Sequence, residues 1–421
     1  MDPRAYGADQ TESSQPEPAG GMRYVARQPI MDLHGRVHGY ELLFRAGPEA
    51  VFRGDRDTAT RTMLDNSVIF GLEKLTSGFP AFVNCTAQAL TEEFVRVLPP
   101  SMTILEILED VEPTPSLIEA CLELKGAGFR LALDDFVWKP ELAPLVHLAD
   151  YIKVDFTLLD SAGRASLRRQ LGRTPIAMVA EKVETQEEYK QACAEGFTLF
   201  QGYYFCRPIL IKNRKVPANQ VAYMEILRLL QCESMDMREL GRLVKRDASL
   251  TYRLLRLVNS PMYAVRYEVR SIEAALVMVG EETFRRIATL AIASEFNANQ
   301  PQEILRMAFV RGRFCELAAG LCALKSTEQY LLGLFSLVPA MLRVAMSELA
   351  PALPFREKIR EALLGTPSLE RSLLHWTECY ERGDWVKCDA IADSHGLNQE
   401  EILRCYGEAA VWAEAALQAA G

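Results

Sequence analysis

The sequence predicts an α/β chain in which a (β/α) barrel is followed by an all-helical domain. From Tyr24 to about Pro208, short apolar runs alternate with segments of helical period. That alternation is typical of parallel strands joined by crossover helices. Beyond this part, apolar residues recur with helical period to Gly421. Alternation alone also allows an open doubly wound sheet, but the number of strand candidates favours a barrel.

Composition sets the expected domain limits. Residues 1–21 are rich in Pro, Gly, Ser, Gln and Glu, which predicts a disordered tail. The barrel is expected over 22–210. A polar junction over 211–219 predicts a linker, and 220–421 is expected to form the helical domain with a C-terminal helical extension.

The strand candidates of the first half are apolar runs bounded by turn residues. They are Tyr24–Ile30, Val37–Phe44, Ala81–Cys85, Thr103–Leu108, Phe129–Phe136, Tyr151–Phe156, Ile176–Glu181 and Thr198–Phe205. Two intervening helices have clear start signals. Thr114 with Pro115 predicts an N-cap and first turn, and Thr185 with Glu188 predicts a capping box.

Apolar faces define the helices of the second half. Tyr223, Leu227 and Leu230 share one face, and Leu250, Leu254 and Leu257 share another before Pro261 ends that helix. No strand pattern returns before the end of the chain.

Charge and cysteine usage narrow the class of protein. The formal net charge of −9 over 421 residues argues against a generic nucleic-acid-binding protein. The ten cysteines include no C-x-x-C pair, which favours reduced thiols in the cytoplasm over disulfides or zinc. The longest apolar stretch, about 331–342, is too short to span a bilayer, so no membrane association is expected.

Polar side chains stand at the ends of most strand candidates. The carboxyl ends of barrel strands face a common cleft, so these side chains are expected to meet there. Each alone has a simpler explanation as a cap or a solvated rim residue. The set comprises Glu41, Asn84, Glu106, Asp134, Asp135, Lys153, Asp155, Glu181, Glu184 and Gln201.

Carboxylates gathered in one cleft repel each other unless cations neutralise them. Oxygen ligands without Cys or His select Mg²⁺ or Mn²⁺ over Zn²⁺. Two such ions could polarise a phosphodiester and stabilise both the attacking and the leaving oxygens. Lys153 would then orient the attacking water or meet developing phosphate charge.

These motifs, in this order, resemble the EAL domain, a TIM-like barrel whose members hydrolyse cyclic di-GMP to the linear dinucleotide. The resemblance covers about residues 23–210. It rests on Gln28-Pro29-Ile30, Glu41-Leu42-Leu43-Phe44-Arg45, Asn84, Glu106, Asp134-Asp135-Phe136, Lys153-Val154-Asp155, Glu181-Lys182-Val183-Glu184 and Gln201-Gly202-Tyr203.

The resemblance implies roles for individual residues and a dimer through the barrel. A two-metal site of Mg²⁺ or Mn²⁺ would be held by Glu41, Asn84, Glu106, Asp134, Asp135 and Glu181. Lys153 and Glu184 would join Glu41 and Glu181 in the catalytic set. The ligand-binding residues would be Gln28, Arg45, Asp155 and Gln201.

Three departures from the family pattern bear on turnover. Leu42 replaces the usual Ala, and Lys182 replaces the usual Gly. The Gly-rich loop after the Asp pair is replaced by Val137-Trp138-Lys139-Pro140, which removes backbone freedom at the edge of the cleft.

The segment from about Gln220 to Phe296 resembles an HDOD domain, through Asp247-Ala248-Ser249-Leu250, Leu257-Val258-Asn259-Ser260-Pro261 and Ser271-Ile272-Glu273-Ala274-Ala275-Leu276. The chain has no His-Asp dipeptide, so phosphohydrolase chemistry is not expected in this half. A protein-interaction role is expected instead, with an unidentified partner.

Three hypotheses follow. The first is a metal-dependent cyclic di-GMP phosphodiesterase coupled to an HDOD domain. The second is a catalytically weak or inactive EAL domain acting as a cyclic di-GMP receptor or an interaction scaffold, favoured by the altered loop. The third, a nucleic-acid-binding regulator, rests on basic residues of the helical half that include Arg242, Lys245 and Arg253. The more ordinary interpretation of those basic residues is a solvated face paired with acids.

Overall fold

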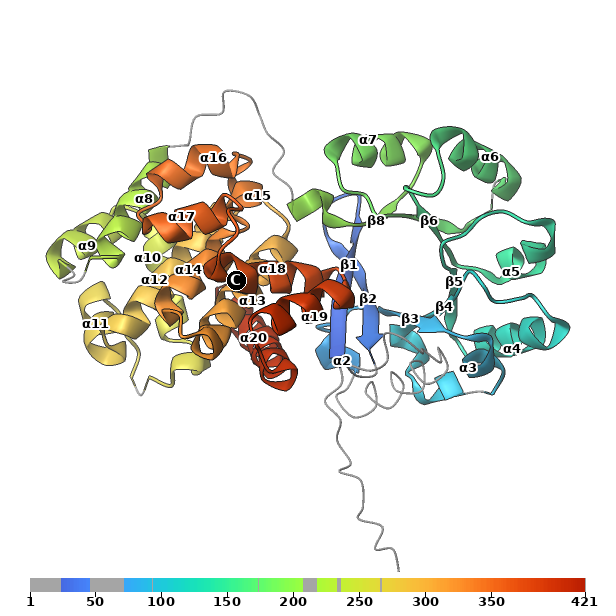
Figure 1. Cartoon of the computed structure of the whole chain (residues 1–421), viewed down its shortest axis with the longest axis horizontal. Helices are drawn as coiled ribbons and strands as arrows, with labels where there is room; N and C mark the ends of the chain where they lie inside the picture. The colour runs from blue at the N-terminus through green and yellow to red at the C-terminus, as the bar shows by residue number, and fades with distance from the viewer. Residues whose placement is uncertain are drawn as a thin grey trace, which may run out of the picture.

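The computed structural model describes residues 24–45, 72–92, 94–172, 174–206, 218–232, 236–265 and 267–420. The predicted tail and most of the predicted linker lie outside these ranges. The described chain forms a barrel and a helical domain that lie side by side (Figure 1).

The barrel is closed, with eight strands in chain order. Its strands are β1 (Tyr24–Asp32), β2 (Val37–Arg45), β3 (Ala81–Cys85), β4 (Thr103–Ile107), β5 (Arg130–Leu133), β6 (Tyr151–Asp155), β7 (Ala177–Glu181) and β8 (Leu199–Gln201). All eight strand candidates are therefore present. The last is shorter than predicted, because the chain turns into a 3₁₀ helix, η5, over Tyr203–Cys206.

One prediction about the sheet was wrong, because β1 is not parallel to its neighbours. It runs antiparallel to both β2 and β8, while β2 to β8 are parallel to one another. Only residues 33–36 separate β1 from β2. A connection this short makes a hairpin, since a parallel crossover needs a dozen residues or more.

Short helices surround the parallel strands: α2 (Leu72–Leu75), α3 (Ala87–Thr91), α4 (Pro115–Gly126), α5 (Ala143–Leu148), α6 (Ser161–Leu171) and α7 (Gln186–Glu195). Both predicted start signals are confirmed. The hydroxyl of Thr114 accepts from the Leu117 amide at 3.3 Å, and Thr185 and Glu188 form a reciprocal capping box.

Side chains fill the barrel in layers. The lower layer is apolar and comprises Ile30, Phe82, Ile104, Ala132, Tyr151, Val179 and Leu199. Most of the predicted polar side chains occupy the next layer, toward the carboxyl ends of the parallel strands. Side chains alternate along a strand, so every second residue points inward, and this places Glu41 and Glu106 above the apolar layer.

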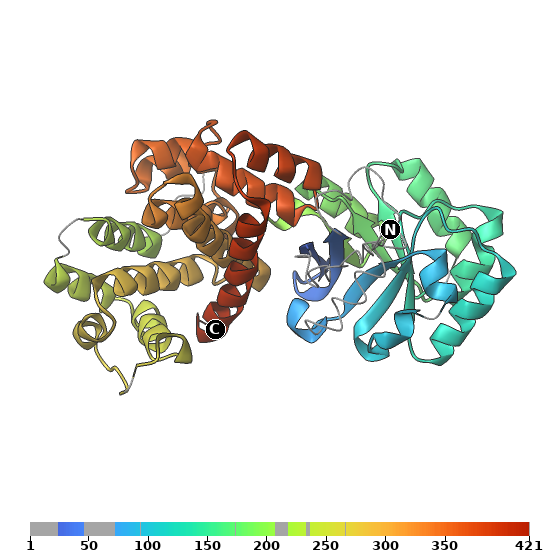
Figure 2. The ribbon, with the colours of Figure 1, turned by 60° about the horizontal axis from the view of Figure 1, so that its bottom comes forward.

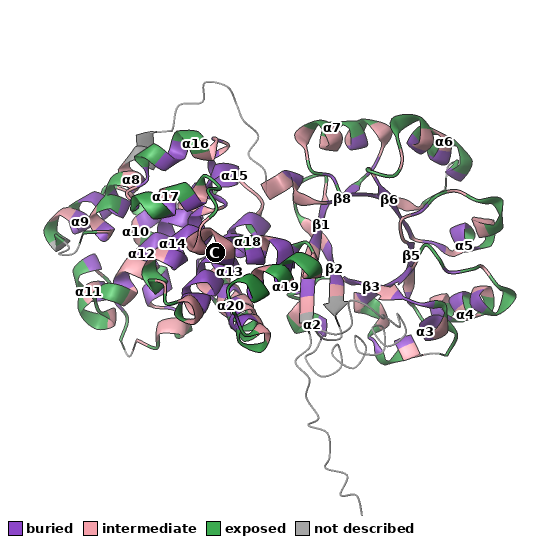
Figure 3. Ribbon diagram, viewed as in Figure 1, coloured by how far each residue is buried: buried purple, intermediate pink, exposed green. Residues whose placement is uncertain are grey.

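The second half is helical throughout its described residues. It comprises α8 (Ala218–Leu230), α9 (Met237–Val244), α10 (Ala248–Val258), α11 (Ile272–Val279), α12 (Glu281–Phe296), α13 (Gln302–Ala318), α14 (Ser326–Phe335), α15 (Val338–Leu342), α16 (Met346–Leu349), α17 (Glu357–Leu363), α18 (Leu369–Glu381), α19 (Trp385–Ser394) and α20 (Gln399–Ala420). One apolar core joins them, and their outer faces are exposed (Figure 3).

The helical domain packs on the β1–β2 hairpin. A hairpin has no crossover helix to cover its outer face, and α13 and α20 take that place. The hydroxyl of Tyr40 donates to the buried carboxylate of Glu303 at 2.8 Å. On the other face of the hairpin, the one that carries Glu41, Ala26 belongs to the core of the helical domain and Leu43 packs against it. In the turned view of Figure 2, the C-terminal helices lie between the bulk of the helical domain and β1.

Within the described residues, no single helix has the length and apolar character needed to cross a membrane. Two segments that satisfy this test only together, Ser326–Leu342 and Met346–Ala352, are bent by 110° and supply residues to the helical core.

Candidate functional site

The polar layer of the barrel receives one side chain from or next to each strand. These are Gln28, Glu41, Asn84, Glu106, Asp134, Lys153, Glu181 and Gln201. Asp134 follows β5 directly, and its amide donates to the Ile107 carbonyl at 3.0 Å, which continues the ladder between β4 and β5 past the end of β5. Residues spread over more than 170 positions of the chain therefore share one mouth.

The Lys153 ammonium lies at the centre of this layer. Its Nζ is 3.1 Å from Glu41 Oε2 and 2.9 Å from an oxygen of each of Glu106, Asp134 and Glu181. The Lys153 side chain is only 1% exposed. Lys153 was expected beside the carboxylates; the structure places it among them.

Three amides complete the layer around Glu41. Asn84 Nδ2 donates to Glu41 Oε1 at 3.1 Å, and Gln201 Nε2 donates to Glu41 Oε2 at 2.6 Å. The same Gln201 nitrogen donates to Gln28 Oε1 at 2.9 Å. Gln28 is therefore linked to Glu41 through Gln201.

Burial and neighbouring charges shift the pKa values of the carboxyl groups in different directions. Burial raises the pKa of Glu106 well above its usual range, and Lys153 only partly offsets this. Burial likewise raises the pKa of Glu181 to about 8, with Asp134 and Glu41 adding to it. Burial alone would also raise the pKa of Glu41, but Lys153, Gln201 and Asn84 lower it. The layer thus has more carboxylates than one ammonium can neutralise.

The donor atoms fit a hard divalent cation. In the described part of the chain, no hydrogen-bond donor reaches Asn84 Oδ1, Glu106 Oε2 or Glu181 Oε2, although all three are buried. Buried oxygens without donors are costly unless a cation meets them, and an all-oxygen set suits Mg²⁺ or Mn²⁺. The carboxylates here are drawn onto Lys153, and no group of three or more acidic, His or Cys side chains in the described ranges is arranged around an ion position.

A second group of charges lies beside the first, at Asp135, Asp155 and Lys182. The Lys182 ammonium forms an ion pair with Asp155 and lies 4.0 Å from Asp135 Oδ2. Lys182 has a φ of +55°, in the region that favours glycine. Thr157 also donates to Asp155, from its amide and its hydroxyl, both at 2.6 Å. Sequence reasoning noted Lys182 only as a departure from a glycine and missed this pairing.

One predicted site residue stands apart from the central layer. Glu184 is exposed just before α7, where its amide donates to the Glu188 carboxylate at 2.8 Å. The side chain of Arg45 lies outside the described part.

The altered loop after the Asp pair is packed. Trp138 lies edge-on to Phe136, with ring centroids 6.4 Å apart; Phe136 belongs to the outer core of the barrel, and Trp138 is partly buried against it. Pro140 begins a 3₁₀ helix, η4, over Pro140–Leu142. Trp138 therefore anchors this segment and Pro140 fixes one φ angle, whereas a glycine-rich loop would be free to move.

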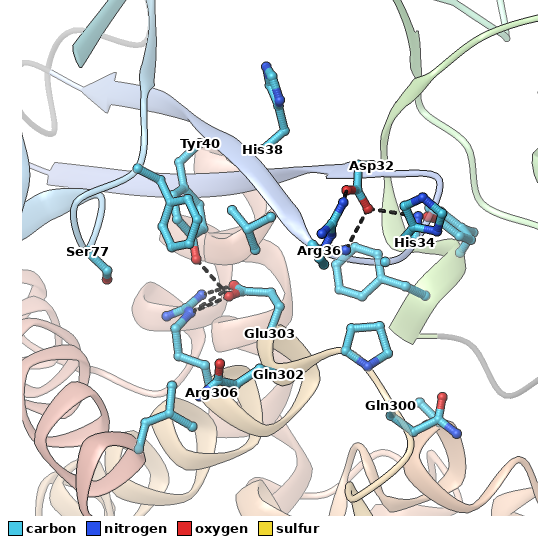
Figure 4. A pocket seen from close by; sticks show the side chains of 18 of the residues that line it. Asp32, His34, Arg36, His38, Tyr40, Ser77, Gln300, Gln302, Glu303 and Arg306 are labelled. Carbon is cyan, nitrogen blue, oxygen red and sulfur yellow. Dashed lines mark hydrogen bonds and ion pairs between the residues drawn. The ribbon is translucent and has the colours of Figure 1, made fainter. Parts of the chain in front are cut away.

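A cavity of about 1250 Å³ lies between the domains, at the amino end of β2 and therefore at the opposite end of the barrel from Glu41. Figure 4 shows its labelled side chains, with Tyr40 and Arg306 both joined to Glu303 and Arg36 joined to Asp32. These charges compensate one another, so the cavity lacks the concentrated charge of the polar layer.

Several basic residues of the helical half are paired with acids. Lys245 Nζ lies 2.6 Å from Glu273, and Arg253 Nε lies 2.6 Å from Glu295. Arg242 and Arg270 likewise pair with Glu239 and Glu268. This arrangement supports the solvated-face interpretation over a nucleic-acid surface.

Comparison with known proteins agrees with both halves. Residues 59–208 match the model of the EAL domain, and residues 216–377 match that of the HDOD domain. The uncharacterized protein YuxH of Bacillus subtilis is 34% identical over 400 residues, which cover 92% of this chain and 97% of that protein. The cyclic di-GMP phosphodiesterase CdgJ of Vibrio cholerae is 33% identical over 398 residues, which cover 93% of this chain and 92% of that protein.

The chain belongs to the EAL–HDOD family. The HDOD match ends at residue 377, so the last turn of α18 and all of α19 and α20 lie beyond it. Glu41 lies before residue 59, where the match to the EAL domain begins. Its assignment rests on the motif Glu41-Leu42-Leu43-Phe44-Arg45 of the hairpin. Among solved structures, BlrP1 of Klebsiella pneumoniae, in complex with calcium and cyclic di-GMP, aligns with a TM-score of 0.37 and 24% identity over 44% of this chain and 55% of that one.

Proposed function

We propose that this EAL–HDOD protein is a metal-dependent phosphodiesterase that hydrolyses cyclic di-GMP to linear pGpG. The observation that carries the proposal is the convergence of four carboxylates and their supporting amides on one mouth of the barrel. The relative CdgJ, similar over nearly its whole length, is named for this activity.

Each residue of the layer has a proposed role. Glu41, Asn84, Glu106, Asp134, Asp135 and Glu181 would hold Mg²⁺ or Mn²⁺. Bound there, the ions would activate water and neutralise charge on the scissile phosphate. Burial would by itself lower the pKa of Lys153, but its four carboxylates raise it well above the usual range. In this arrangement the protonated form of Lys153 is favoured, and its proposed role is that of a hydrogen-bond donor to the attacking water or the phosphate. Glu184 remains a candidate catalytic group.

The ligand would be held at the same mouth. Gln28 and Gln201 present amides beside Glu41, and Arg45 is the proposed partner of a ligand phosphate. Asp155 is engaged by Thr157 and Lys182. The proposed contribution of Asp155 is to hold the Lys182 ammonium near Asp135.

A second candidate function rests on the packed loop at Val137–Pro140. Trp138 and Pro140 restrict motion at the edge of the cleft, which favours a receptor that binds the dinucleotide and turns it over slowly. In that case metal and ligand sites would be retained while the rate is low.

The test is direct incubation of the purified full chain with cyclic di-GMP and Mn²⁺ or Mg²⁺, followed by chromatography of the products. Linear pGpG that disappears in Glu41→Ala but persists in Glu123→Ala, an exposed carboxylate of α4, supports the enzyme. Tight binding without product supports the receptor. If the protein neither binds cyclic di-GMP nor forms product, both the enzyme and the receptor hypotheses are contradicted.

The remaining proposals concern organisation. We propose an EAL domain over 22–210, a linker over 211–219 and an HDOD domain with its extension over 220–421, acting in the cytoplasm. The HDOD half would bind a protein partner, and the chain would form a homodimer. Light scattering on a sizing column, with and without cyclic di-GMP, tests the dimer.

A further inference from the structure

The corner between α18 and α19 lies beside the β1–β2 hairpin (Figure 1), and α18 contacts β1. Gly383, in this corner, faces Leu43: a Cβ built on Gly383 would lie 2.7 Å from Leu43 Cδ1. Leu43 is two residues beyond Glu41 on β2, so both side chains are on the same side of the strand. The corner therefore contacts β2 at the next position beyond Glu41 on that side of the strand.

A main-chain oxygen of this corner accepts a hydrogen bond from the barrel. Gln28 Nε2 donates to the carbonyl of Glu381, the last residue of α18, at 3.3 Å. The final carbonyls of a helix have no partner within the helix and carry its negative end. Across the described residues, no backbone amide donates to this carbonyl. Gln28 thus caps α18 from another domain.

Hydrogen bonds connect this cap to the candidate catalytic layer. Gln28 accepts from Gln201, and Gln201 donates to Glu41. A single chain of side-chain contacts therefore runs from the α18 carbonyl to a proposed metal ligand, with Gln28 between two fixed partners.

The corner is itself held in place. The buried carboxylate of Glu381 accepts from Arg311 Nε at 3.0 Å and from Arg311 Nη2 at 2.6 Å. The Arg382 guanidinium lies 5.0 Å from the ring centroid of Tyr203, next to β8. Such anchoring lets a weak hydrogen bond impose a definite orientation, because the acceptor does not move away.

We propose that the α18–α19 corner is a positioning element of the barrel site, which orients Gln28 toward the dinucleotide. This inference rests on the proposed function and adds a coupling to it: the segment beyond the HDOD match favours ligand binding. The helical domain then supports the site through Gln28.

A pair of glycine substitutions isolates the contact. Gly383 and Gly396 both have positive φ, +71° and +61°, and a Cβ at Gly396 would meet nothing within 4 Å. Asn tolerates this backbone region better than other side chains. Gly383→Asn therefore pushes on Leu43, while Gly396→Asn, at the other end of α19, introduces the same residue without a contact.

In the full chain, Gly383→Asn is expected to raise KM for cyclic di-GMP about fivefold, the effect of losing one hydrogen bond. The value of kcat should change less than about twofold, because Lys153 and Asn84 still hold Glu41. Gly396→Asn should leave both constants at the wild-type value. Adding Leu43→Ala to Gly383→Asn removes the atoms that collide and should return KM to that of Leu43→Ala alone.

Equal KM values for the two glycine variants, or parallel losses of kcat in both, would overturn the proposal. A spectroscopic measurement separates this outcome from failure of the proposed function. In protein labelled with ¹⁵N-glutamine, the Gln28 side-chain amide signal should shift in Gly383→Asn and not in Gly396→Asn, whether or not the protein hydrolyses the dinucleotide. An unshifted signal would reject the positioning role directly.

Discussion

Lys153 is the residue on which the polar layer depends when no other cation is present. Among the described residues it alone meets four carboxylates, and its ammonium is buried. Removing one partner of a buried ion pair leaves uncompensated charge and typically costs about 3–5 kcal/mol. Lys153→Met is therefore expected to lower the free energy of unfolding by about that amount in metal-free buffer.

Divalent ions should restore part of this loss, since the same oxygens would then surround a stronger cation. The measurement is the melting temperature with chelator and with Mn²⁺, and the Mn²⁺-induced rise should be larger in Lys153→Met than in the wild type. Lys125→Met, which removes a partly exposed partner of Asp150, is the control and should show no enhanced response. An identical Mn²⁺ shift in all three proteins would argue against a metal site here.

Single residues show both the reach and the limit of sequence reasoning. The inward positions of Glu41 and Glu106 follow from alternation along strands, so the members of the layer could be found without coordinates. Lys182 could not be placed in the same way. Its long side chain crosses from β7 to Asp155 on β6, a contact set by the spacing and twist of neighbouring strands.

The β1–β2 hairpin is the element that joins the domains. Its outer face is covered by helices far away in sequence, and the Tyr40 hydroxyl is fixed to Glu303 there. A hydrogen bond to a charged group contributes about 1.5–3 kcal/mol. Tyr40→Phe should lower the free energy of unfolding by an amount of that order.

Tyr40→Phe should destabilise the hairpin locally as well as lower the global free energy of unfolding. Hydrogen exchange followed by mass spectrometry should show faster exchange in β1 and β2, with β5 to β7 unchanged. Tyr330→Phe is a matched control, because that hydroxyl is buried without a hydrogen-bond partner in the described residues and its removal should cost almost nothing. Similar effects of both substitutions would mean that the hydroxyl of Tyr40 contributes no specific stability.

The hairpin also shows why strand direction was mispredicted. The strand pattern itself was correct, and the error came from extending the βαβ rule to the first connection. The short segment at 33–36 carried the contrary signal, since it is too short for a crossover. The docking of the helical domain on this hairpin had no comparable signal, because it joins surfaces more than 250 positions apart.

At the scale of the whole molecule, charge pairs join the two ends of the described chain. Arg27 of β1 forms an ion pair with Glu414 of α20 and lies 4.6 Å from the ring centroid of Tyr40. Burial alone would raise the pKa of Glu414, but Arg27 and Arg306 lower it below the usual value. The ionised carboxylate is therefore favoured in the folded protein.

This shift fixes the sign of a pH dependence. A carboxyl group with a lowered folded-state pKa adds stability above its unfolded pKa of about 4.3, and that contribution disappears as the pH falls through the folded value. Glu414→Gln should therefore lower the free energy of unfolding by about 1 kcal/mol at pH 7, the typical effect of one hydrogen-bonded pair. Urea titrations from pH 7 to pH 3.5 should show this difference shrinking below about pH 4.5. Glu408→Gln, an exposed position on the same helix, should follow the wild-type curve throughout. If the difference for Glu414→Gln were constant over that range, the ion pair would not be what holds α20 to the barrel.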